Sequence, residues 1–204
     1  MSNRPVHPQS PASRPAQQVR IIGGEWKRTP LPVINATHLR PTPDRVRETV
    51  FNWLHHLCGS RWPQMTCLDL FAGSGALGFE AASRGAQQVT LVENQSAVVK
   101  QLEALKDKLH AQQIHIVRGD AVLSAQRFIT QQQSFDLIFL DPPYNQGWLE
   151  KTLPLCRQML KSHGLIYAES AAALPLGDAQ HGWLAGWEVV RADKAGMVFY
   201  HLLR

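Results

Sequence analysis

The sequence contains little cysteine, and its three cysteines form no recognisable metal or disulfide pattern. Cys58, Cys67 and Cys156 are odd in number and lack the C-x-x-C spacing of a zinc site. The nine histidines show no H-x-x-x-H spacing either. We therefore expect buried, reduced thiols, as in a cytoplasmic protein, and no bound metal.

Long apolar runs are also absent. The 204 residues include no stretch of about 18 apolar side chains, so we expect no transmembrane helix. Residues 1–18 are rich in Pro, Ser and Gln and lack the apolar centre of a secretory signal peptide. Such a composition cannot bury enough apolar surface to fold, and we interpret it as a disordered tail.

Negative charge is scarce in the first third of the chain. Residues 1–61 carry nine Lys and Arg against three Asp and Glu, whereas the other 143 residues carry 12 basic and 13 acidic side chains. The excess positive charge therefore belongs entirely to the N-terminal part. A basic segment beside a nearly neutral body favours a polyanionic partner, although an ordinary solvated surface is the alternative.

The N-terminal part predicts a short strand at residues 19–24 and a helix that starts near residue 43. Thr42 suits the N-cap and Pro43 the first helical position. The helix has one apolar stripe, formed by Val46, Val50, Leu54 and Leu57. Arg45 and Arg47 lie off this stripe, where they are expected to face a partner. The composition changes near residue 62, which divides the chain into a tail (1–18), a basic N-terminal extension (19–61) and a main domain (62–204).

The main domain alternates short apolar runs with helical segments. The expected strands are 66–72, 88–93, 114–119, 135–141, 164–170, 187–192 and 197–203, and the expected helices are 74–85, 96–110, 121–133 and 149–160. Strands this apolar, separated by helices, indicate a parallel sheet covered on both faces. The last two strands are joined by residues 193–196, a hairpin-length loop. The predicted fold is α/β: a doubly wound, mostly parallel, seven-stranded, Rossmann-like sheet.

A glycine-rich turn follows the first of these strands. Gly73-x-Gly75-x-x-Gly78 opens a helix, and glycines there allow a ligand to approach backbone N–H groups. Glu93 ends the next strand, where a carboxylate can accept the hydroxyls of a ribose. Asp120 ends the third strand, where it can meet an adenine edge. This pattern predicts an adenosine-containing ligand, and by itself it permits NAD as readily as S-adenosylmethionine.

The strand at residues 135–141 ends in Asp141-Pro142-Pro143-Tyr144, which must face the same crevice as the glycine-rich turn. These residue types suit methylation of an exocyclic amine. The Asp141 carboxylate and the Pro142 carbonyl can hold the two hydrogens of the amine, and the Tyr144 ring can stack on the base. Because a duplex hides that amine, the target must be single-stranded or flipped out. An alternative is that Asp-Pro-Pro only ends the strand and Tyr144 belongs to the core.

These residues carry a family resemblance. LDLFAGSGALGFEAASRGA, VEN, RGDA and FLDPPY resemble the class I methyltransferases that modify exocyclic amines. RIIGGEWKR (residues 20–28) and RPTPDRVRETVFNWL (residues 40–54) are similar to the bacterial 16S ribosomal RNA guanine-N2 methyltransferases, and the match covers nearly all of residues 19–204.

The resemblance implies catalysis at Asp141, Pro142, Pro143 and Tyr144, without a metal, by a cytoplasmic monomer. It implies S-adenosylmethionine as the cofactor and S-adenosylhomocysteine as its product. The residues expected to bind the cofactor are Asp69, Gly73, Ser74, Gly75, Gly78, Glu93, Asp120 and Ala121. The implied partner is 16S ribosomal RNA or the small ribosomal subunit, and the expected phosphate contacts are Arg20, Lys27, Arg28, Arg40, Arg45 and Arg47.

Two alternatives stay open on the sequence. The first is an adenine-N6 methyltransferase acting on DNA or RNA, because such enzymes hold the amine with the same motif. The second is an NAD-binding protein or a non-catalytic RNA-binding protein. Outside the motifs, Glu169 lies at the end of the fifth strand of the main domain; it could approach the crevice, but we expect a solvated strand end.

Overall fold

The computed structural model describes residues 19–32, 43–144, 146–175 and 181–204. The predicted tail at 1–18, Arg40 and the predicted cap Thr42 lie outside these ranges. The helices are α1 (Asp44–Cys58), α2 (Ala76–Ser83), α3 (Ser96–Lys108), α4 (Ala121–Thr130) and α5 (Trp148–Met159), with short 3-10 helices η1 (Gly59–Gln64) and η2 (Gly182–Leu184). The strands are β1 (Val19–Arg20), β2 (Pro30–Leu31), β3 (Thr66–Asp69), β4 (Gln88–Glu93), β5 (Ile114–Arg118), β6 (Phe135–Leu140), β7 (Leu160–Ser170), β8 (Val189–Ala195) and β9 (Val198–Leu203).

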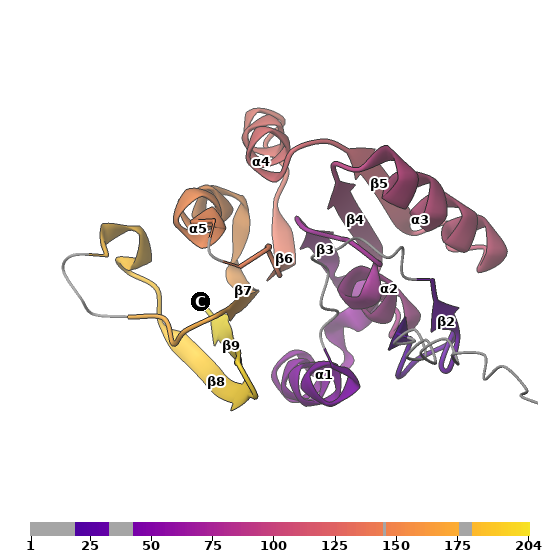
Figure 1. Ribbon diagram of the computed structural model, residues 1–204, viewed down its shortest axis with the longest axis horizontal. Coiled ribbons are helices and arrows are strands. Elements are labelled where there is room, and N and C mark those ends of the chain that lie inside the picture. Colours follow the sequence, from indigo (N-terminus) through magenta and orange to yellow (C-terminus); the bar gives the residue numbers. More distant parts are fainter. Residues whose placement is uncertain (1–18, 33–42, 145, 176–180) are drawn as a thin grey trace, which may run out of the picture.

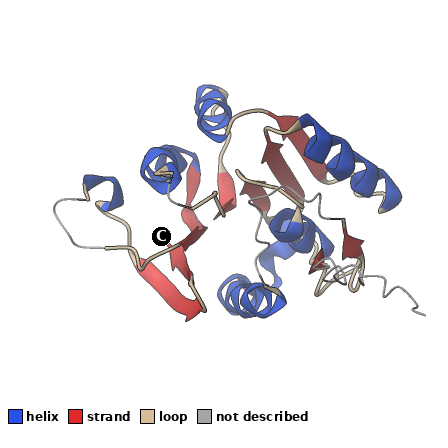
Figure 2. Ribbon diagram, viewed as in Figure 1, coloured by secondary structure: helices blue, strands red, loops and turns tan. Residues whose placement is uncertain are grey.

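Seven strands form one sheet in the order β5-β4-β3-β6-β7-β9-β8. The strands from β5 to β7 pair in parallel, whereas β9 runs antiparallel between β7 and β8. Figure 2 shows helices on both sides of this sheet. The predicted doubly wound, mostly parallel fold is confirmed. The strand order reverses between β3 and β6, which places a topological switch point at these two adjacent strands.

The two faces of the sheet are covered by different helices (Figure 1). On one face, α1, α2 and α3 pack on a core that contains Phe51, Phe79 and Leu91. On the other face, α4 and α5 pack on a core that contains Ile138 and Leu153. Because successive strand residues point to opposite faces, strands buried this way are apolar almost throughout, as the sequence had indicated. No helix among the described residues is long and apolar enough to cross a membrane.

The turn between β8 and β9 differs from the prediction. We expected a loop at residues 193–196, but β8 continues through Ala195 and pairs with Val198 at the start of β9. The turn falls on Gly196, whose φ of 62° is left-handed, and on Met197. The glycine permits a tighter turn than the sequence pattern suggested.

The basic segment is packed against the main domain. Val19, Ile21, Trp26 and Leu31 are buried in the same core as helix α2. The backbone N–H of Ile22 donates to the fully buried Glu80 carboxylate at 2.6 Å, and the Trp26 N–H donates to Ser83 Oγ at 2.9 Å. Helix α2 therefore holds this segment in place through hydrogen bonds as well as apolar contacts.

Helix α1 corrects two expectations about the basic segment. Its N-cap is Pro43 and its first residue is Asp44, one position later than predicted. Arg47 was expected to face a partner, and this is wrong because its side chain is fully buried. Its guanidinium donates to Asp44 Oδ1 at 2.6 Å and to the Arg20 carbonyl at 2.8 Å, so it ties the helix to β1.

Gly78 provides a test of how α2 packs on the sheet. A Cβ atom there would lie 2.1 Å from Cδ2 of Leu91, which is fully buried and has little room to move. We expect Gly78→Ala to lower the free energy of unfolding by about 1–3 kcal/mol, as overpacked cores do. Urea unfolding measures this change. Gly182→Ala is the control, because a Cβ there meets nothing within 4 Å; equal stability losses in the two variants would contradict the packing argument.

Candidate active site

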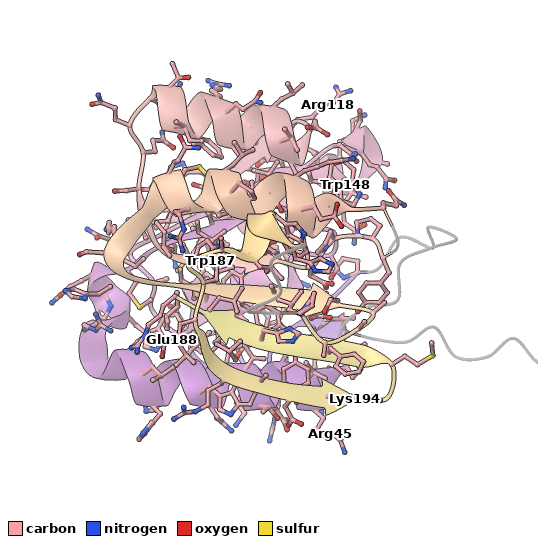
Figure 3. All side chains as sticks on the ribbon, turned by 90° about the vertical axis from the view of Figure 1, so that its left-hand side faces the viewer. Arg45, Arg118, Trp148, Trp187, Glu188 and Lys194 are labelled. Carbon is pink, nitrogen blue, oxygen red and sulfur yellow. The ribbon has the colours of Figure 1, made fainter. Side chains whose placement is uncertain are left out.

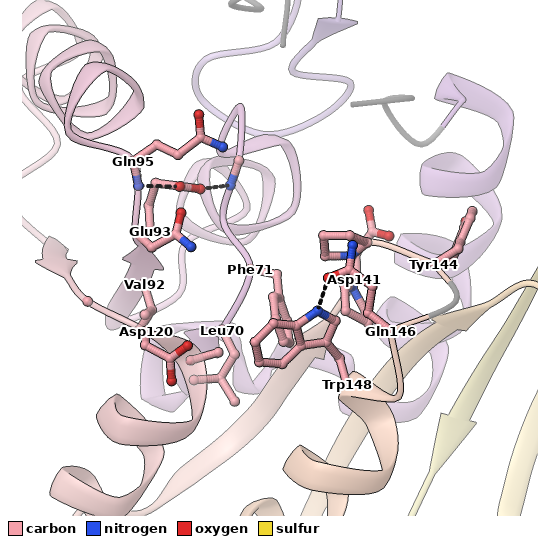
Figure 4. A pocket seen from close by; sticks show the side chains of 16 residues that line it. Leu70, Phe71, Val92, Glu93, Gln95, Asp120, Asp141, Tyr144, Gln146 and Trp148 are labelled. Carbon is pink, nitrogen blue, oxygen red and sulfur yellow. Dashed lines mark hydrogen bonds between the residues drawn. The ribbon is translucent and has the colours of Figure 1, made fainter. Parts of the chain in front are cut away.

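A cavity of about 450 Å³ opens at the carboxyl ends of β3, β4, β5 and β6. Eight of the residues proposed from the sequence line it: Gly73, Glu93, Asp120, Ala121, Asp141, Pro142, Pro143 and Tyr144. Figure 4 shows Glu93, Gln95 and Asp120 on one side and Asp141 and Tyr144 on the other. The residues predicted to bind the cofactor and those predicted to act in catalysis thus line the same cavity. Asp69, Ser74, Gly75 and Gly78 are not among the described residues that line it.

The glycine-rich turn is a tight connection between β3 and α2. The Gly75 N–H donates to the Ala72 carbonyl at 2.7 Å, and Gly75 has a left-handed φ of 79°. A Cβ at Gly75 would lie 2.6 Å from the Phe79 ring and 2.9 Å from Leu102 Cδ2. Only glycine satisfies both the backbone angle and the space. Gly75 therefore shapes the turn, and Gly73 carries its backbone to the cavity wall.

Glu93 connects this turn to β4. The side chain is 9% exposed, and each carboxylate oxygen accepts a backbone hydrogen bond. Oε2 accepts from the Gly73 N–H at 3.0 Å, and Oε1 accepts from the Gln95 N–H at 2.8 Å (Figure 4). Because a carboxylate oxygen has two lone pairs, each oxygen can accept one further hydrogen bond from a ligand.

Asp120 caps helix α4. Its Oδ1 accepts from the Val122 N–H at 2.9 Å and from the Leu123 N–H at 3.0 Å. This bonding satisfies two of the helix's terminal N–H groups, which stabilises the start of α4. The cap also fixes the carboxylate at the cavity wall, where Gly119 and Ala121 flank it.

Asp69 lies at the end of β3, and its side chain is 1% exposed. Its Oδ1 accepts a hydrogen bond from the Phe71 N–H at 3.3 Å. Burial raises the pKa of Asp69 to about 7, although hydrogen bonds from the Phe71 and Gly78 backbones act in the opposite direction. The carboxyl group thus organises the glycine-rich turn from inside the protein.

The Asp141-Pro142-Pro143-Tyr144 motif follows β6 directly. Asp141 and Tyr144 are half-buried, Pro142 is buried, and Pro143 is exposed. Two consecutive prolines restrict the backbone, so the Pro142 carbonyl, which directly follows Asp141, has little conformational freedom. A pair of acceptors fixed in this way can bind both hydrogens of an amine.

Two aromatic residues that were not predicted as site residues form one wall of the cavity. Phe71 and Trp148 line the cavity, with ring centroids 5.7 Å apart and planes at 67°. The Trp148 indole N–H donates to Gln146 Oε1 at 2.9 Å (Figure 4). Trp148 follows Tyr144 by four residues, so its place beside the motif was a usable sequence signal.

Glu169 corrects another expectation. It was predicted to be a solvated strand end, but its side chain is 1% exposed. It accepts hydrogen bonds from the hydroxyls of Tyr144 at 3.3 Å and Tyr167 at 2.6 Å. A buried carboxylate therefore contacts the last residue of the Asp-Pro-Pro-Tyr motif.

Of the predicted RNA contacts that the structure describes, Arg47 is buried and the other four are exposed. Lys27, Arg28 and Arg45 are exposed, as is Arg20, which pairs with Asp44 at 3.0 Å. In Figure 3, Arg45 and Lys194 lie on the same side of the molecule as Arg118 and Trp148, away from Glu188.

The described residues include no group of three or more His, Cys, Asp or Glu side chains placed to hold a metal ion.

Comparison with known proteins identifies relatives over most of the chain. The family described as "Conserved hypothetical protein 95" matches residues 19–204. Ribosomal RNA small subunit methyltransferase D of Escherichia coli K12 is 41% identical over 188 residues, covering 91% of this chain and 89% of the relative. The protein of that name from Haemophilus influenzae is 38% identical over 192 residues, covering 91% and 93%. A solved structure of a putative methyltransferase from Escherichia coli is 40% identical, with a TM-score of 0.74 and coverage of 91% and 97%.

The raised pKa of Asp69 predicts a pH dependence of stability. Between the ordinary pKa of 3.8 and the folded value of about 7, the folded protein keeps a proton that the unfolded chain has lost. The folded state therefore binds more protons, and stability must fall as pH rises through this range. Asparagine at position 69 cannot titrate, so the stability of the Asp69→Asn variant does not fall for this reason.

We expect the unfolding free energy of Asp69→Asn, relative to wild type, to rise by about 2–3 kcal/mol between pH 5 and pH 8. Urea unfolding at several pH values measures the difference. Asp107→Asn, on the exposed surface of α3, is the matched control. A difference that stays constant with pH would refute the assignment of the buried proton to Asp69.

Proposed function

The chain belongs to the family of ribosomal RNA small subunit methyltransferase D, and from this membership we propose that it methylates ribosomal RNA. Specifically, it transfers the methyl group of S-adenosylmethionine to an exocyclic amine of a nucleobase, N2 of a guanine in 16S ribosomal RNA. The observation that carries the proposal is that the Asp141–Tyr144 motif and the Glu93–Asp120 side share one cavity. Methyl transfer requires such a space, because donor and acceptor must meet directly.

The residues on the Glu93 side fit an adenosyl ligand. Glu93 can accept hydrogen bonds from ribose hydroxyls, and Asp120 and its neighbouring backbone can meet the adenine edge. Leu70 and Val92 add apolar surface for the purine ring. The Gly73 backbone lies in the same wall and gives the ligand close access to the turn. When bound, S-adenosylmethionine supplies an electrophilic methyl group on a sulfonium.

The Asp141 side suits the methyl acceptor. The amine of a nucleobase is a poor nucleophile, because its lone pair is delocalised into the ring. Acceptance of one hydrogen by the Asp141 carboxylate and the other by the Pro142 carbonyl draws the nitrogen toward a tetrahedral form and directs its lone pair. The nitrogen then forms the new N–C bond as the S–C bond breaks. The extra proton passes to Asp141 or to water, and stacking on Tyr144 holds the base.

Guanine is favoured over adenine by the N-terminal sequence rather than by the motif. Residues 20–28 and 40–54 are similar to the guanine-N2 enzymes, whereas Asp-Pro-Pro-Tyr serves both bases. Two curated relatives are named for the small ribosomal subunit, which supports 16S RNA as the substrate. The three cysteines are free and buried, which suits a cytoplasmic enzyme whose thiols stay reduced.

Exposed basic residues supply the contacts to RNA. Positive charge comes from two places: the segment that packs beside α2 carries Arg20, Lys27 and Arg28, and helix α1 carries Arg45. Such side chains neutralise phosphates and position the strand without reading its bases. Arg47 is excluded from this role by its burial. The target base must be unpaired or flipped out to reach the cavity.

Nucleoside analysis tests the reaction and the base together. The purified protein is incubated with 16S ribosomal RNA, or with small subunits from a strain that lacks the enzyme, and methyl-labelled S-adenosylmethionine. We expect label in N2-methylguanosine. Label in N6-methyladenosine would replace the guanine assignment, and no label in either substrate would overturn the function. Asp141→Ala should lose at least about 100-fold in turnover, because its grip acts chiefly on the transition state, with cofactor affinity within about twofold of wild type.

Salt dependence tests the basic segment. The triple variant Arg20/Lys27/Arg28→Ala should weaken RNA binding and reduce the slope of log K against log salt by about two to three units, close to one for each phosphate that is no longer neutralised. S-adenosylmethionine affinity should change little. Arg127/Arg191/Arg204→Ala removes the same charge elsewhere and is the matched control. Identical slopes for the two triple variants would mean that the segment is an ordinary charged surface.

A further inference from the structure

A buried carboxylate lies beneath the catalytic motif and contacts its tyrosine. Glu169 is 1% exposed and accepts hydrogen bonds from Tyr144 at 3.3 Å and from Tyr167 at 2.6 Å. Tyr167 is fully buried in the core, with its ring against Phe139 of β6. Glu169 therefore connects the half-buried ring of the catalytic motif to the rigid centre of the sheet.

The sheet register explains how this contact arises. Strands β6 and β7 are parallel neighbours, and Leu140 pairs with Ala168. Asp141 and Glu169 each follow this pair by one residue, so the two carboxylates occupy equivalent positions on adjacent strands. Side chains alternate along a strand, so Glu169 points to the same face as Tyr167. The Tyr144 hydroxyl reaches it from the loop after Asp141.

Burial of a carboxylate is costly unless hydrogen bonds compensate it, and two phenolic donors provide that compensation here. The negative charge also has a consequence for its neighbour, because the Glu169 carboxylate adds to the rise that burial causes in the pKa of Tyr167. A ring that only stacks on a base needs no hydroxyl, and phenylalanine would serve. The Tyr144 hydroxyl has a partner, and that partner is anchored in the core.

We propose that Glu169 is a positioning residue for the methyl acceptor: it fixes the Tyr144 ring, through the ring's hydroxyl, in the orientation against which the target base stacks. The proposal rests on the function proposed above. The rigid Pro142–Pro143 backbone holds one end of the Tyr144 segment, and Glu169 holds the far end of the ring. Bonds of this kind are often long without substrate and tighten when it binds, which fits the 3.3 Å distance.

An arm of the test that needs no RNA uses fluorine NMR. The chain has three tyrosines, so protein labelled with 3-fluorotyrosine gives three signals that Tyr→Phe variants assign. In Glu169→Ala the Tyr144 signal should shift and narrow, because the ring loses its anchor and moves more freely. In Glu188→Ala the Tyr144 signal should stay in place, since Glu188 is exposed and pairs with Arg204, beyond the end of β9 that is remote from Glu169. An unchanged Tyr144 signal in Glu169→Ala would overturn the proposal, whether or not the protein methylates RNA.

A double-mutant cycle tests the same link in catalysis. Glu169→Ala and Tyr144→Phe should each lower kcat by about tenfold, and the double variant should fall no more than about twofold below either. Glu169→Gln, whose amide can still accept the hydroxyl, should recover to within about threefold of wild type. S-adenosylmethionine affinity should stay within about twofold in all of them, which shows that the fold is intact.

Multiplied losses in the double variant would mean that Glu169 acts independently of Tyr144, and the positioning role would be wrong. A Glu169→Gln variant as slow as Glu169→Ala would equally overturn it, because the carboxylate would then act by its charge. Inactive wild-type protein in this assay counts against the proposed function alone, and the fluorine signals still decide the role of Glu169.

Discussion

The parallel register of β3 between β4 and β6 sets the position of the groups from these three strand ends that line the cavity. Asp69, the last residue of β3, pairs with Leu91 on one side and Phe139 on the other. The three strands therefore end at nearly the same level, and the chain that leaves each one turns toward the same space. Backbone amides from the first turn, a carboxylate from the second strand and the Asp-Pro-Pro-Tyr motif from the fourth meet there because parallel pairing permits no other edge.

Much of this edge was predictable from sequence, because it depends on local patterns. An apolar run followed by Gly-x-Gly, by Glu93 or by Asp-Pro-Pro marks a strand end whatever the rest of the chain does. Strand ends of one parallel sheet must share an edge, so the residues could be grouped before any contact was known. Gly78 was grouped with the cofactor-binding residues, whereas in the structure a Cβ there would meet Leu91 of the sheet, a packing role that was not predicted.

Burial of charged residues was less predictable, because it is decided by distant parts of the chain. Arg47 seemed to lie off the apolar stripe of α1, but the Arg20 carbonyl and Asp44 provide polar partners at its buried position. Glu169 seemed to be an exposed strand end, but Tyr167 of the same strand and Tyr144 from the loop after β6 donate hydrogen bonds to it. Phe71 and Trp148 were overlooked because single aromatic residues carry no periodicity; their closeness in sequence to the motifs was the signal that could have identified them. For each of the two charged residues one partner is remote in sequence: Arg20 for Arg47 and Tyr144 for Glu169.

Helix α2 serves two neighbours at once. Its first turn follows the glycines that approach the cavity, and its last turn holds residues 22–26 through Glu80 and Ser83. Trp26 and Phe79 pack together between them, with ring centroids 6.4 Å apart. The basic segment and the main domain therefore share one core and cannot be separated as independent modules. Cutting the chain near residue 62, or fusing a foreign RNA-binding domain there, would expose this apolar surface. The Glu80 carboxylate would also lose the hydrogen bond that the Ile22 N–H donates to it.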